Sequence, residues 1–364
     1  MCLGIETSCD ETAAAVLTEG RIVLSSVVSS QDDIHRRYGG VVPELAARHH
    51  LEAILPVIDR AVTAAGAAWD ALDLVAVTCG PGLPAALLVG LAVAKALAFG
   101  RGLPVVGVNH LLGHLFALSL RDENTPDRGI GWPIDLPSDQ DLPRPAVGLV
   151  VSGSHTDLCY LPPEGGLRVL GTTLDDAAGE AFDKVARLIG LPYPGGPALD
   201  RLAATGDPSR IAFPRTSGSL EGPRGGLRGV AGELAFSFSG LKTAVALRVE
   251  RGQDDPADIA ASFQQAVVDT LVMRAMAALQ RTSATTLLVA GGVAANSCLR
   301  GCLERACAER GVHLHIPPLR YCTDNAAMIA AAGWARLAAT GPDNLDLDAA
   351  PDLSLEMSSR RGAV

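Results

Sequence analysis

The stretch LGIETSCDETAAAVL (residues 3–17) and the later stretch VGLVVSGSHTDLCYL (residues 147–161) share one order of apolar and polar residues. In each, a short apolar run leads into a polar turn, and a second apolar run follows the turn. A third such run comes next in both places, at residues 21–28 and at 167–171. The repeated order predicts two lobes that each begin with three strands.

Each predicted lobe continues with helical sequence and then with a buried strand that ends in a glycine loop. These strands are residues 74–78 and 286–290, and a helix is expected after each loop. The sequence therefore predicts an α/β chain made of two β-β-β-α-β-α lobes. The expected bounds are 1–120 for lobe one, completed by a helix at about 324–345; 145–323 for lobe two, with an irregular insertion at about 205–233; and 121–144 for an inter-lobe linker.

Length and charge agree with two lobes and restrict the partners. The chain has 364 residues, and a single core rarely grows past about 250–300 residues. The net charge of −10 argues against a general affinity for nucleic acid, because phosphate binding needs clustered Lys and Arg. Any RNA must therefore meet a local basic patch or a partner's patch. The candidate patch residues are Arg36, Arg37, Arg48, Arg210, Arg215, Arg224 and Arg228.

Several segments bear on compartment and packing. The eight cysteines include no C-x-x-C pair, and no secretion signal is recognised, so we expect a cytoplasmic protein with free thiols. Residues 83–99 form the longest apolar stretch, which is shorter than a membrane span and is expected to be a buried helix. A second helix is expected to bury one apolar face made of Leu51, Ile54, Leu55, Ile58 and Val62.

The clearest metal-binding pattern is His110-x-x-x-His114. Asn109 is a plausible N-cap, and a helix that begins after it would place both imidazoles on one face. Asp324 could supply a third ligand, although Asp324 or Thr323 could instead only cap the helix that follows. Two histidines and a carboxylate suit iron, zinc or manganese. A zinc peptidase of the H-E-x-x-H type would need glutamate at the position of Leu111.

Glycine loops and carboxylates provide further candidates. The loops at 151–154 and 291–293 follow strands, where backbone N–H groups can approach a phosphate, although such loops can also be simple turns. Asn296 could cap a helix or bind a nucleotide. A carboxylate beside a nucleotide could hold a metal or accept a proton. The acidic residues near these strand ends are Glu6, Asp10, Glu11, Asp175, Asp176, Glu180 and Asp183.

Ten motifs together resemble those of the TsaD family. They are GIETSCDET (4–12), YGGVVPELA (38–46), GPGL (80–83), HLLGH (110–114), VSG (151–153), DDAAGEAFDK (175–184), YPGGP (193–197), FSFSGLKT (236–243), GGVAAN (291–296) and CTDN (322–325). The resemblance extends from about residue 3 to residue 340. It implies two RNase H-like lobes of the actin, sugar-kinase and Hsp70 superfamily, with the ligand in a cleft between them.

The resemblance also implies a reaction. The threonylcarbamoyl group of threonylcarbamoyl-AMP, made by a separate synthase, would be transferred to N6 of the adenosine 3′ of the anticodon, in tRNAs that read A-starting codons, with release of AMP. One divalent metal per subunit is implied, with Fe²⁺ the first candidate and Zn²⁺ or Mn²⁺ the alternatives. The implied partners are tRNA, a TsaB-like paralogue in a heterodimer and a TsaE-like ATPase, with no membrane.

Site residues follow by matching motif to motif. The implied metal ligands are His110, His114 and Asp324. The implied adenylate contacts are Val150, Val151, Ser152, Gly153, Ser154, Asp183, Gly196, Asp200 and Asn296. Asp10 or Glu11 is the candidate proton acceptor. Ser154 and Leu112 depart from the family pattern, in which glycine and glutamate are usual at these positions.

The sequence is also compatible with three other functions. A small-molecule kinase of the same fold would phosphorylate its substrate with ATP, since the fold alone does not fix the reaction. A metallopeptidase would lose proteolysis when its metal is removed. A non-catalytic scaffold would assemble differently after substitution of His110, His114 or Asp324, without any change in turnover.

Overall fold

The computed structural model describes residues 1–122, 124–134, 142–215 and 234–356. The chain divides into two compact units, of which unit 1 is Met1–Pro143 with Pro317–Val364 and unit 2 is Arg144–Ile316. Of the linker expected at 121–144, the residues up to Pro143 count with unit 1 and Arg144 counts with unit 2. Of the expected insertion at 205–233, residues 216–233 lie outside the described part.

Unit 1 carries five strands and six α-helices within the described residues. Its strands are β1 (Cys2–Glu6), β2 (Glu11–Thr18), β3 (Ile22–Ser30), β4 (Leu74–Gly80) and β5 (Val105–Asn109). Its α-helices are α1 (Asp32–His35), α2 (Pro43–Ala64), α3 (Pro84–Arg101), α4 (His110–Phe116), α10 (Leu319–Cys322) and α11 (Ala326–Thr340). Short 3₁₀ turns lie at Trp69–Ala71 and Ala117–Ser119.

Unit 2 carries the second set of elements. Its strands are β6 (Ala146–Val151), β7 (Thr156–Leu161), β8 (Arg168–Thr172), β9 (Thr286–Ala290) and β10 (His313–His315). Its described α-helices are α5 (Ala178–Leu188), α6 (Gly195–Ala203), α7 (Ser239–Arg251), α8 (Pro256–Thr282) and α9 (Ser297–Ala308). A 3₁₀ turn at Gly292–Ala295 joins β9 to α9.

The two sheets have the same topology, which confirms the predicted duplication. Their strand orders are β3-β2-β1-β4-β5 and β8-β7-β6-β9-β10. In unit 1, β1 and β2, and β2 and β3, pair antiparallel, whereas β4 is parallel to β1 and β5 is parallel to β4. In unit 2, β6, β7, β8, β9 and β10 repeat this pattern of directions. The chain is thus an α/β protein of two lobes with one shared strand order.

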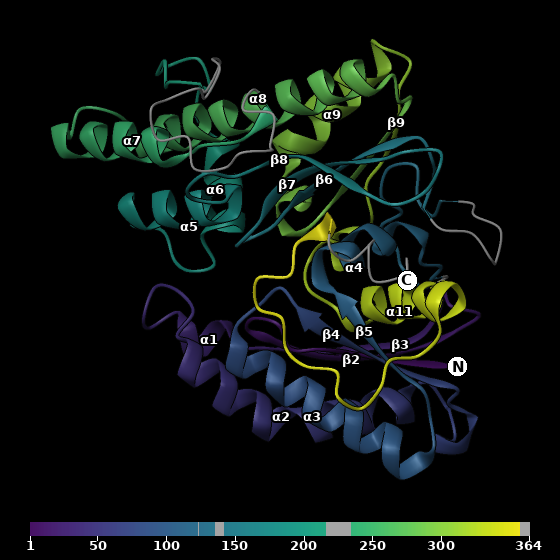
Figure 1. Cartoon of the computed structure of the whole chain (residues 1–364). Coiled ribbons are helices and arrows are strands. Elements are labelled where there is room, and N and C mark those ends of the chain that lie inside the picture. The colour runs from purple at the N-terminus through teal and green to yellow at the C-terminus, as the bar shows by residue number, and fades with distance from the viewer. Residues whose placement is uncertain (123, 135–141, 216–233, 357–364) are drawn as a thin grey trace. The chain divides into compact units, whose positions relative to one another are not determined.

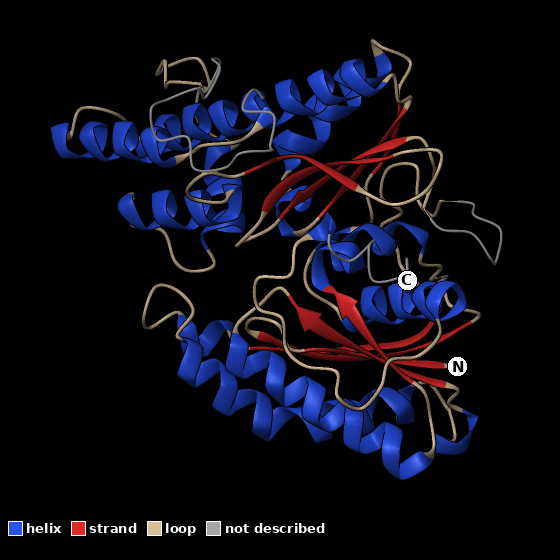
Figure 2. Cartoon of the chain, in the orientation of Figure 1, coloured by secondary structure: helices blue, strands red, loops and turns tan. Residues whose placement is uncertain are grey.

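Helices cover both faces of the sheet in unit 1 (Figures 1 and 2). Helices α2 and α3 pack on one face, and α11 packs against β1, β2 and β4 on the other. All five residues of β1 and all seven of β4 are buried, as expected of central strands covered on both faces. In unit 2, α8 packs against β6 and β7.

Helix α11 lies unusually close to the sheet because glycines face it. A Cβ atom on Gly4 of β1 would lie 2.2 Å from the carbonyl oxygen of Ala326. Within α11, a Cβ on Gly333 would lie 2.4 Å from the Cβ of Ala76 in β4. Real Cβ atoms do not come this close, so both positions require glycine for this packing. The first turn of α11 is therefore fixed against the end of β1.

Two helices differ from their predicted burial. In α2, Ile54, Ile58 and Val62 are buried as expected, but Leu51 and Leu55 are 65% and 60% exposed, so the predicted five-residue buried face is wrong at these two positions. The inner face of α2 is narrower than the apolar pattern indicated.

Helix α3 is apolar almost throughout, and by length and composition alone it could cross a membrane. One face, which includes Leu87, Leu91 and Ala94, is buried, and α3 packs on β4 and α2. Leu88 and Phe99 are exposed, so the prediction of a buried helix holds for one face only.

Candidate functional site

The candidate site of unit 1 forms where three parallel strands end. Strands β1, β4 and β5 run in the same direction, so their carboxyl ends meet at one edge of the sheet. Glu6 is the last residue of β1, Thr78 lies near the end of β4, and Asn109 ends β5. The sequence places polar side chains at each of these ends.

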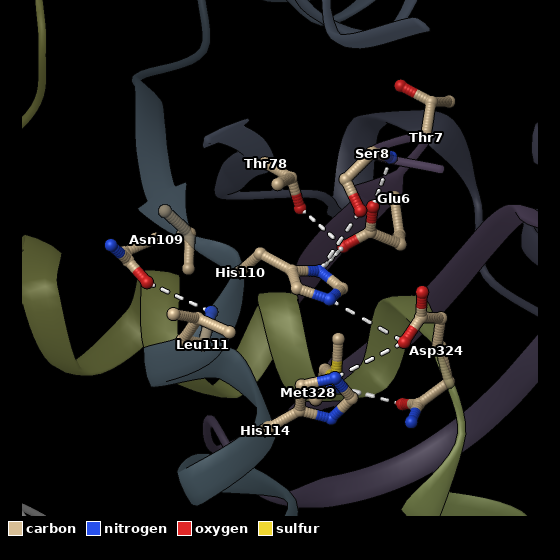
Figure 3. Close-up of polar contacts among 12 residues, drawn as sticks. Glu6, Thr7, Ser8, Thr78, Asn109, His110, Leu111, His114, Asp324 and Met328 are labelled. Carbon is tan, nitrogen blue, oxygen red and sulfur yellow. Dashed lines mark hydrogen bonds and ion pairs between the residues drawn. The ribbon is translucent and has the colours of Figure 1, made fainter. Parts of the chain in front are cut away.

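Helix α4 begins at this edge and presents two histidines (Figure 3). The Asn109 side chain accepts hydrogen bonds from the backbone N–H groups of Leu111 and Leu112, which confirms it as the N-cap. The rings of His110 and His114 lie on one face with centroids 4.7 Å apart. They are 5% and 0% exposed, so neither is an ordinary surface histidine.

Asp324 approaches this histidine pair from the start of α11. Its Oδ1 lies 3.6 Å from Nε2 of His110 and 3.2 Å from Nε2 of His114. The residue that caps α11 is Asn325, whose side chain accepts from the N–H of Met328. The alternative that Asp324 or Thr323 serves as the helix cap is therefore wrong, and the Asp324 carboxylate faces the histidines.

Behind His110 lies a second carboxylate, that of Glu6, which is fully buried. Its Oε2 lies 2.9 Å from Nδ1 of His110 and accepts a 2.7 Å hydrogen bond from the Thr78 hydroxyl. Its Oε1 accepts from the N–H of Ser8. An ionised carboxylate can only accept, so Nδ1 of His110 carries the proton and Nε2 is directed at Asp324 (Figure 3).

The charges of this group are set by burial and by one another. Burial alone raises the pKa of Glu6, but the charge and hydrogen bond of His110 outweigh it and hold that pKa below its ordinary value. Burial alone lowers the pKa of His110, but Asp324 and Glu6 together raise it to about 9. Burial lowers the pKa of His114, so this ring is neutral near pH 7 and keeps a lone pair.

The donor set fits a divalent metal ion. One ligand atom from each of His110, His114 and Asp324 lies within 4.8 Å of the others, which suits ligands about 2.0–2.2 Å from a common ion. Nδ1 of His114 has no hydrogen-bond partner among the described residues, and Nε2 lies 3.2 Å from the Asp324 carboxylate without a well-aligned hydrogen bond. Buried polar atoms are seldom left in this state, and a cation at Nε2 would satisfy one of them. Glu6 would hold His110 as the outer carboxylate of a metal-bound histidine does.

A second acidic group lies near the candidate metal ligands. Ligand atoms of Asp10, Glu11 and Asp32 lie within 4.8 Å of one another. Burial, followed by the charges of Asp10 and Asp324, raises the pKa of Glu11 well above its ordinary value. Asp10 and Glu11 also share a side-chain hydrogen bond.

In unit 2, the loop after β6 is a tight turn. The backbone N–H of Ser152 donates to the carbonyl of His155, and the Ser152 hydroxyl accepts from the His155 N–H. Helix α5 packs directly on this turn, because the N–H of Gly179 donates to the carbonyl of Ser152. Gly153 and Ser154 are exposed, while Val150 and Val151 are buried in β6.

The remaining residues predicted in unit 2 form one connected series. Asp183 of α5 accepts from the N–H groups of Gly195 and Gly196 at the start of α6. Asp200 of α6 accepts from the side chain of Asn296 and from Ser297, at the start of α9. The structure therefore brings Asp183, Gly196, Asp200 and Asn296 together through α5, α6 and α9.

Sequence reasoning missed two residues that position others. The sequence names Glu6 only as one of several acidic candidates near strand ends, although a carboxylate at the end of a fully apolar central strand is a signal of burial. Gln264 of α8 is 6% exposed and accepts from the Asn296 amide at 2.8 Å, and nothing in its local sequence marks it.

The other acidic candidates have structural partners. Asp175 accepts from the N–H groups and hydroxyls at the start of α7, and Asp176 pairs with Lys184 and Lys242. Glu180 pairs with Lys184. Among the predicted basic residues, Arg215 pairs with Asp269. Arg224 and Arg228 lie outside the described residues.

A family model described as tRNA N6-adenosine threonylcarbamoyltransferase, TsaD, matches residues 22–131 and 133–331. The chain belongs to the TsaD family. A Symbiobacterium thermophilum relative with this enzyme name is 51% identical over 357 residues, which are 97% of this chain and 96% of the relative. A Moorella thermoacetica relative of the same name is 49% identical over 358 residues, again 97% and 96% of the two chains.

Solved structures support the predicted superfamily fold of this TsaD family member. T. kodakarensis HypF gives a TM-score of 0.56 at 14% identity and covers 92% of this chain and 47% of that chain. Component A of (R)-2-hydroxyglutaryl-CoA dehydratase from Acidaminococcus fermentans gives 0.50 at 14% identity, with 93% and 99% covered. At these identities the likeness concerns the fold alone. The predicted fold of two RNase H-like lobes is confirmed.

The Glu6→Gln variant of this TsaD chain tests the role assigned to Glu6. The amide keeps the shape of the carboxylate but removes its charge, so His110 is held less firmly and becomes a weaker donor. We expect metal affinity to fall by about 10- to 100-fold while the fold is retained. The measurement is competition against a chromophoric chelator, with circular dichroism as the folding control. Wild-type affinity in a folded variant would contradict the assignment.

Proposed function

We propose that this chain transfers the threonylcarbamoyl group of threonylcarbamoyl-AMP to N6 of the adenosine 3′ of the anticodon, in tRNAs that read A-starting codons. AMP is the leaving group. The observation that carries the proposal is the buried group of His110, His114 and Asp324, in a chain about 50% identical to relatives named for this reaction. The protein would act in the cytoplasm, where its tRNA substrate is found.

The metal proposed for this group is Fe²⁺, one per subunit, with Zn²⁺ and Mn²⁺ as the alternatives that the same donors accept. His110, His114 and Asp324 would hold it. When bound, it would supply Lewis acidity that stabilises negative charge developing on the oxygens of the donor. Because the pKa of His110 is raised to about 9, an ion would displace the proton on Nε2, while Glu6 keeps the Nδ1 proton in place and leaves the Nε2 lone pair to the ion.

Unit 2 would hold the adenylate. The exposed turn at Gly153 and Ser154 leaves backbone N–H groups accessible to a phosphate. Space around Gly196 is open, since a Cβ there would meet nothing within 4 Å, so a ligand can approach the backbone closely. The carboxylates of Asp183 and Asp200 are suited to sugar hydroxyls, and Asn296 is held ready by Asp200 and Gln264.

The pair Asp10 and Glu11 is proposed as the proton acceptor. An adenine amine is a weak nucleophile, and its proton must leave as the carbamoyl carbon is attacked. Burial and the charges of Asp10 and Asp324 raise the pKa of Glu11. The hydrogen bond between the two carboxyls requires one proton between them, so one member of the pair would hold that proton and position the other, ionised member to accept the proton of the amine.

The decisive experiment is mass spectrometry of nucleosides from an unmodified tRNA that reads an A-starting codon. The tRNA is incubated with threonylcarbamoyl-AMP, the metal-loaded protein and its candidate TsaB-like and TsaE-like partners. We expect threonylcarbamoyladenosine, and we expect His110→Ala to abolish it because a metal ligand is lost. No product from a folded, metal-loaded wild-type protein with its partners would contradict the proposal and favour the kinase.

Two further variants in this assay test the proton acceptor. Asp10→Asn and Glu11→Gln preserve shape and remove the basic oxygen. At least one of them should lower kcat by about 10²- to 10⁴-fold while metal content stays at the wild-type level. If the double variant turns over at the wild-type rate, the proton is accepted elsewhere.

The proposed partners are a TsaB-like paralogue, a TsaE-like ATPase and a separate synthase that makes the donor. The TsaB-like paralogue is proposed to bind the surface formed by α2 and α3. The two helices pack against each other and leave Leu51, Leu55 and Leu88 more than half exposed. Exposed apolar side chains on neighbouring helices are typical of a protein interface.

We expect the double variant Leu51→Glu with Leu55→Glu to weaken co-purification of the paralogue by at least about 10-fold, because two charges would be buried in the contact. The matched control is Leu247→Glu on α7, where the leucine is 51% exposed in unit 2. If the double variant still co-purifies with the paralogue at the wild-type level, α2 is not the contact surface.

A further inference from the structure

One exposed turn of unit 1 is supported by two buried polar side chains. The turn is Arg36–Gly39, between α1 and α2. Beneath it lie His35, which is fully buried, and Gln31, which is 1% exposed. Burying two polar side chains costs free energy unless their hydrogen bonds are satisfied. We infer that the two side chains are buried here because they hold the turn in one conformation.

The buried side chains fasten both ends of the turn. Nδ1 of His35 accepts from the N–H of Val42, and its Nε2 lies 3.1 Å from Oε1 of Gln31. The backbone N–H of Gln31 donates to the carbonyl of Asp10. Gln31 is thus hydrogen-bonded to Asp10, which is proposed to help accept the proton.

The backbone of the turn is also closed on itself. The N–H of Tyr38 donates to the carbonyl of His35, and the N–H of Gly39 donates to that of Arg36. Gly39 has a φ of +68°, a conformation that glycine adopts without strain. The side chains of Arg36, Arg37 and Tyr38 therefore project from a fixed backbone, and all three are exposed.

These three side chains have the chemistry that binds single-stranded RNA. The side chain of Tyr38 is 60% exposed. Among the described residues, Phe99 is the other aromatic side chain with most of its surface exposed. Unpaired bases stack on aromatic rings, and arginines contact the adjoining phosphates. Residues 34–42 carry two arginines and no carboxylate, in a chain whose net charge is −10. Arg36 also lies 3.1 Å from the exposed Asp33, an ion pair that water and salt weaken.

We propose that the turn Arg36–Gly39 is a contact surface for the anticodon loop of the tRNA, with a base stacked on Tyr38 and phosphates near Arg36 and Arg37. This inference rests on the proposed transfer reaction and adds to it the part of the chain that receives the acceptor. A loop that must present an adenine beside Asp10 and Glu11 requires a fixed contact nearby. The turn follows His35, whose side chain contacts that of Gln31, and the backbone N–H of Gln31 donates to the carbonyl of Asp10.

The test measures binding of an unmodified tRNA that reads an A-starting codon, by fluorescence anisotropy, to the full chain with its partners. Tyr38→Ala should weaken binding by about 10-fold or more, whereas Tyr38→Phe should stay within about 2-fold because the ring remains. Arg36→Ala and Arg37→Ala should each reduce the slope of log affinity against log salt by about 0.7.

Arg310→Ala in unit 2 is the matched control. The side chains of Arg36 and Arg310 are 53% and 54% exposed, and each lies beside a carboxylate close in sequence. The control variant should bind tRNA as the wild type does. AMP release from threonylcarbamoyl-AMP in the absence of tRNA should be unchanged in all variants of the turn.

Two results would overturn the proposal. Wild-type tRNA affinity and salt dependence in Tyr38→Ala and the arginine variants would exclude the turn as an RNA contact. Loss of a protein partner from Tyr38→Ala at unchanged tRNA affinity would assign the turn to a protein interface. In both cases the wild-type protein still forms threonylcarbamoyladenosine, whereas failure of the proposed function would show as no product from the wild type itself.

Discussion

The absence of a side chain at Gly4 is the constraint on which the candidate metal site depends. Because β1 and the first turn of α11 touch through backbone atoms, Asp324 is carried to the carboxyl end of β1 and not to solvent. Gly333 repeats the close contact two turns later, against Ala76 of β4. Asp324, a candidate metal ligand far along the sequence, is thereby placed against His110, His114 and the carboxylate of Glu6.

The buried charges of this edge support one another. Glu6 is fully buried, yet its oxygens accept from Ser8, Thr78 and His110, so its desolvation is offset by three hydrogen bonds. Among the described residues His114 has no comparable set of hydrogen bonds: its Nδ1 has no partner, and its Nε2 faces the Asp324 carboxylate at 3.2 Å. Glu6 therefore has its hydrogen bonds satisfied within the protein, whereas His114 is suited to bind an external ligand.

Much of the fold could be predicted because strands and turns leave local signals. The order of short apolar runs predicted the duplicated sheet, and the spacing of His110 and His114 predicted their shared face. The burial of Glu6 and the role of Gln264 depend on contacts with distant segments, and no local pattern encodes them. Leu51 and Leu55 fit a helical apolar pattern but lie outside the buried face, because the pattern does not say how wide a face the sheet can cover.

Metal binding by Asp324 is tested by the thermal unfolding midpoints of the wild type and of Asp324→Asn, each with and without saturating Fe²⁺ or Zn²⁺ under reducing, anaerobic conditions. A metal that binds only the folded chain must raise the midpoint, by an amount that grows with the logarithm of the free metal concentration divided by Kd. We expect a clear rise for the wild type and a much smaller one for Asp324→Asn. Equal rises in the two proteins would mean that the ion binds elsewhere and that Asp324 is not a ligand.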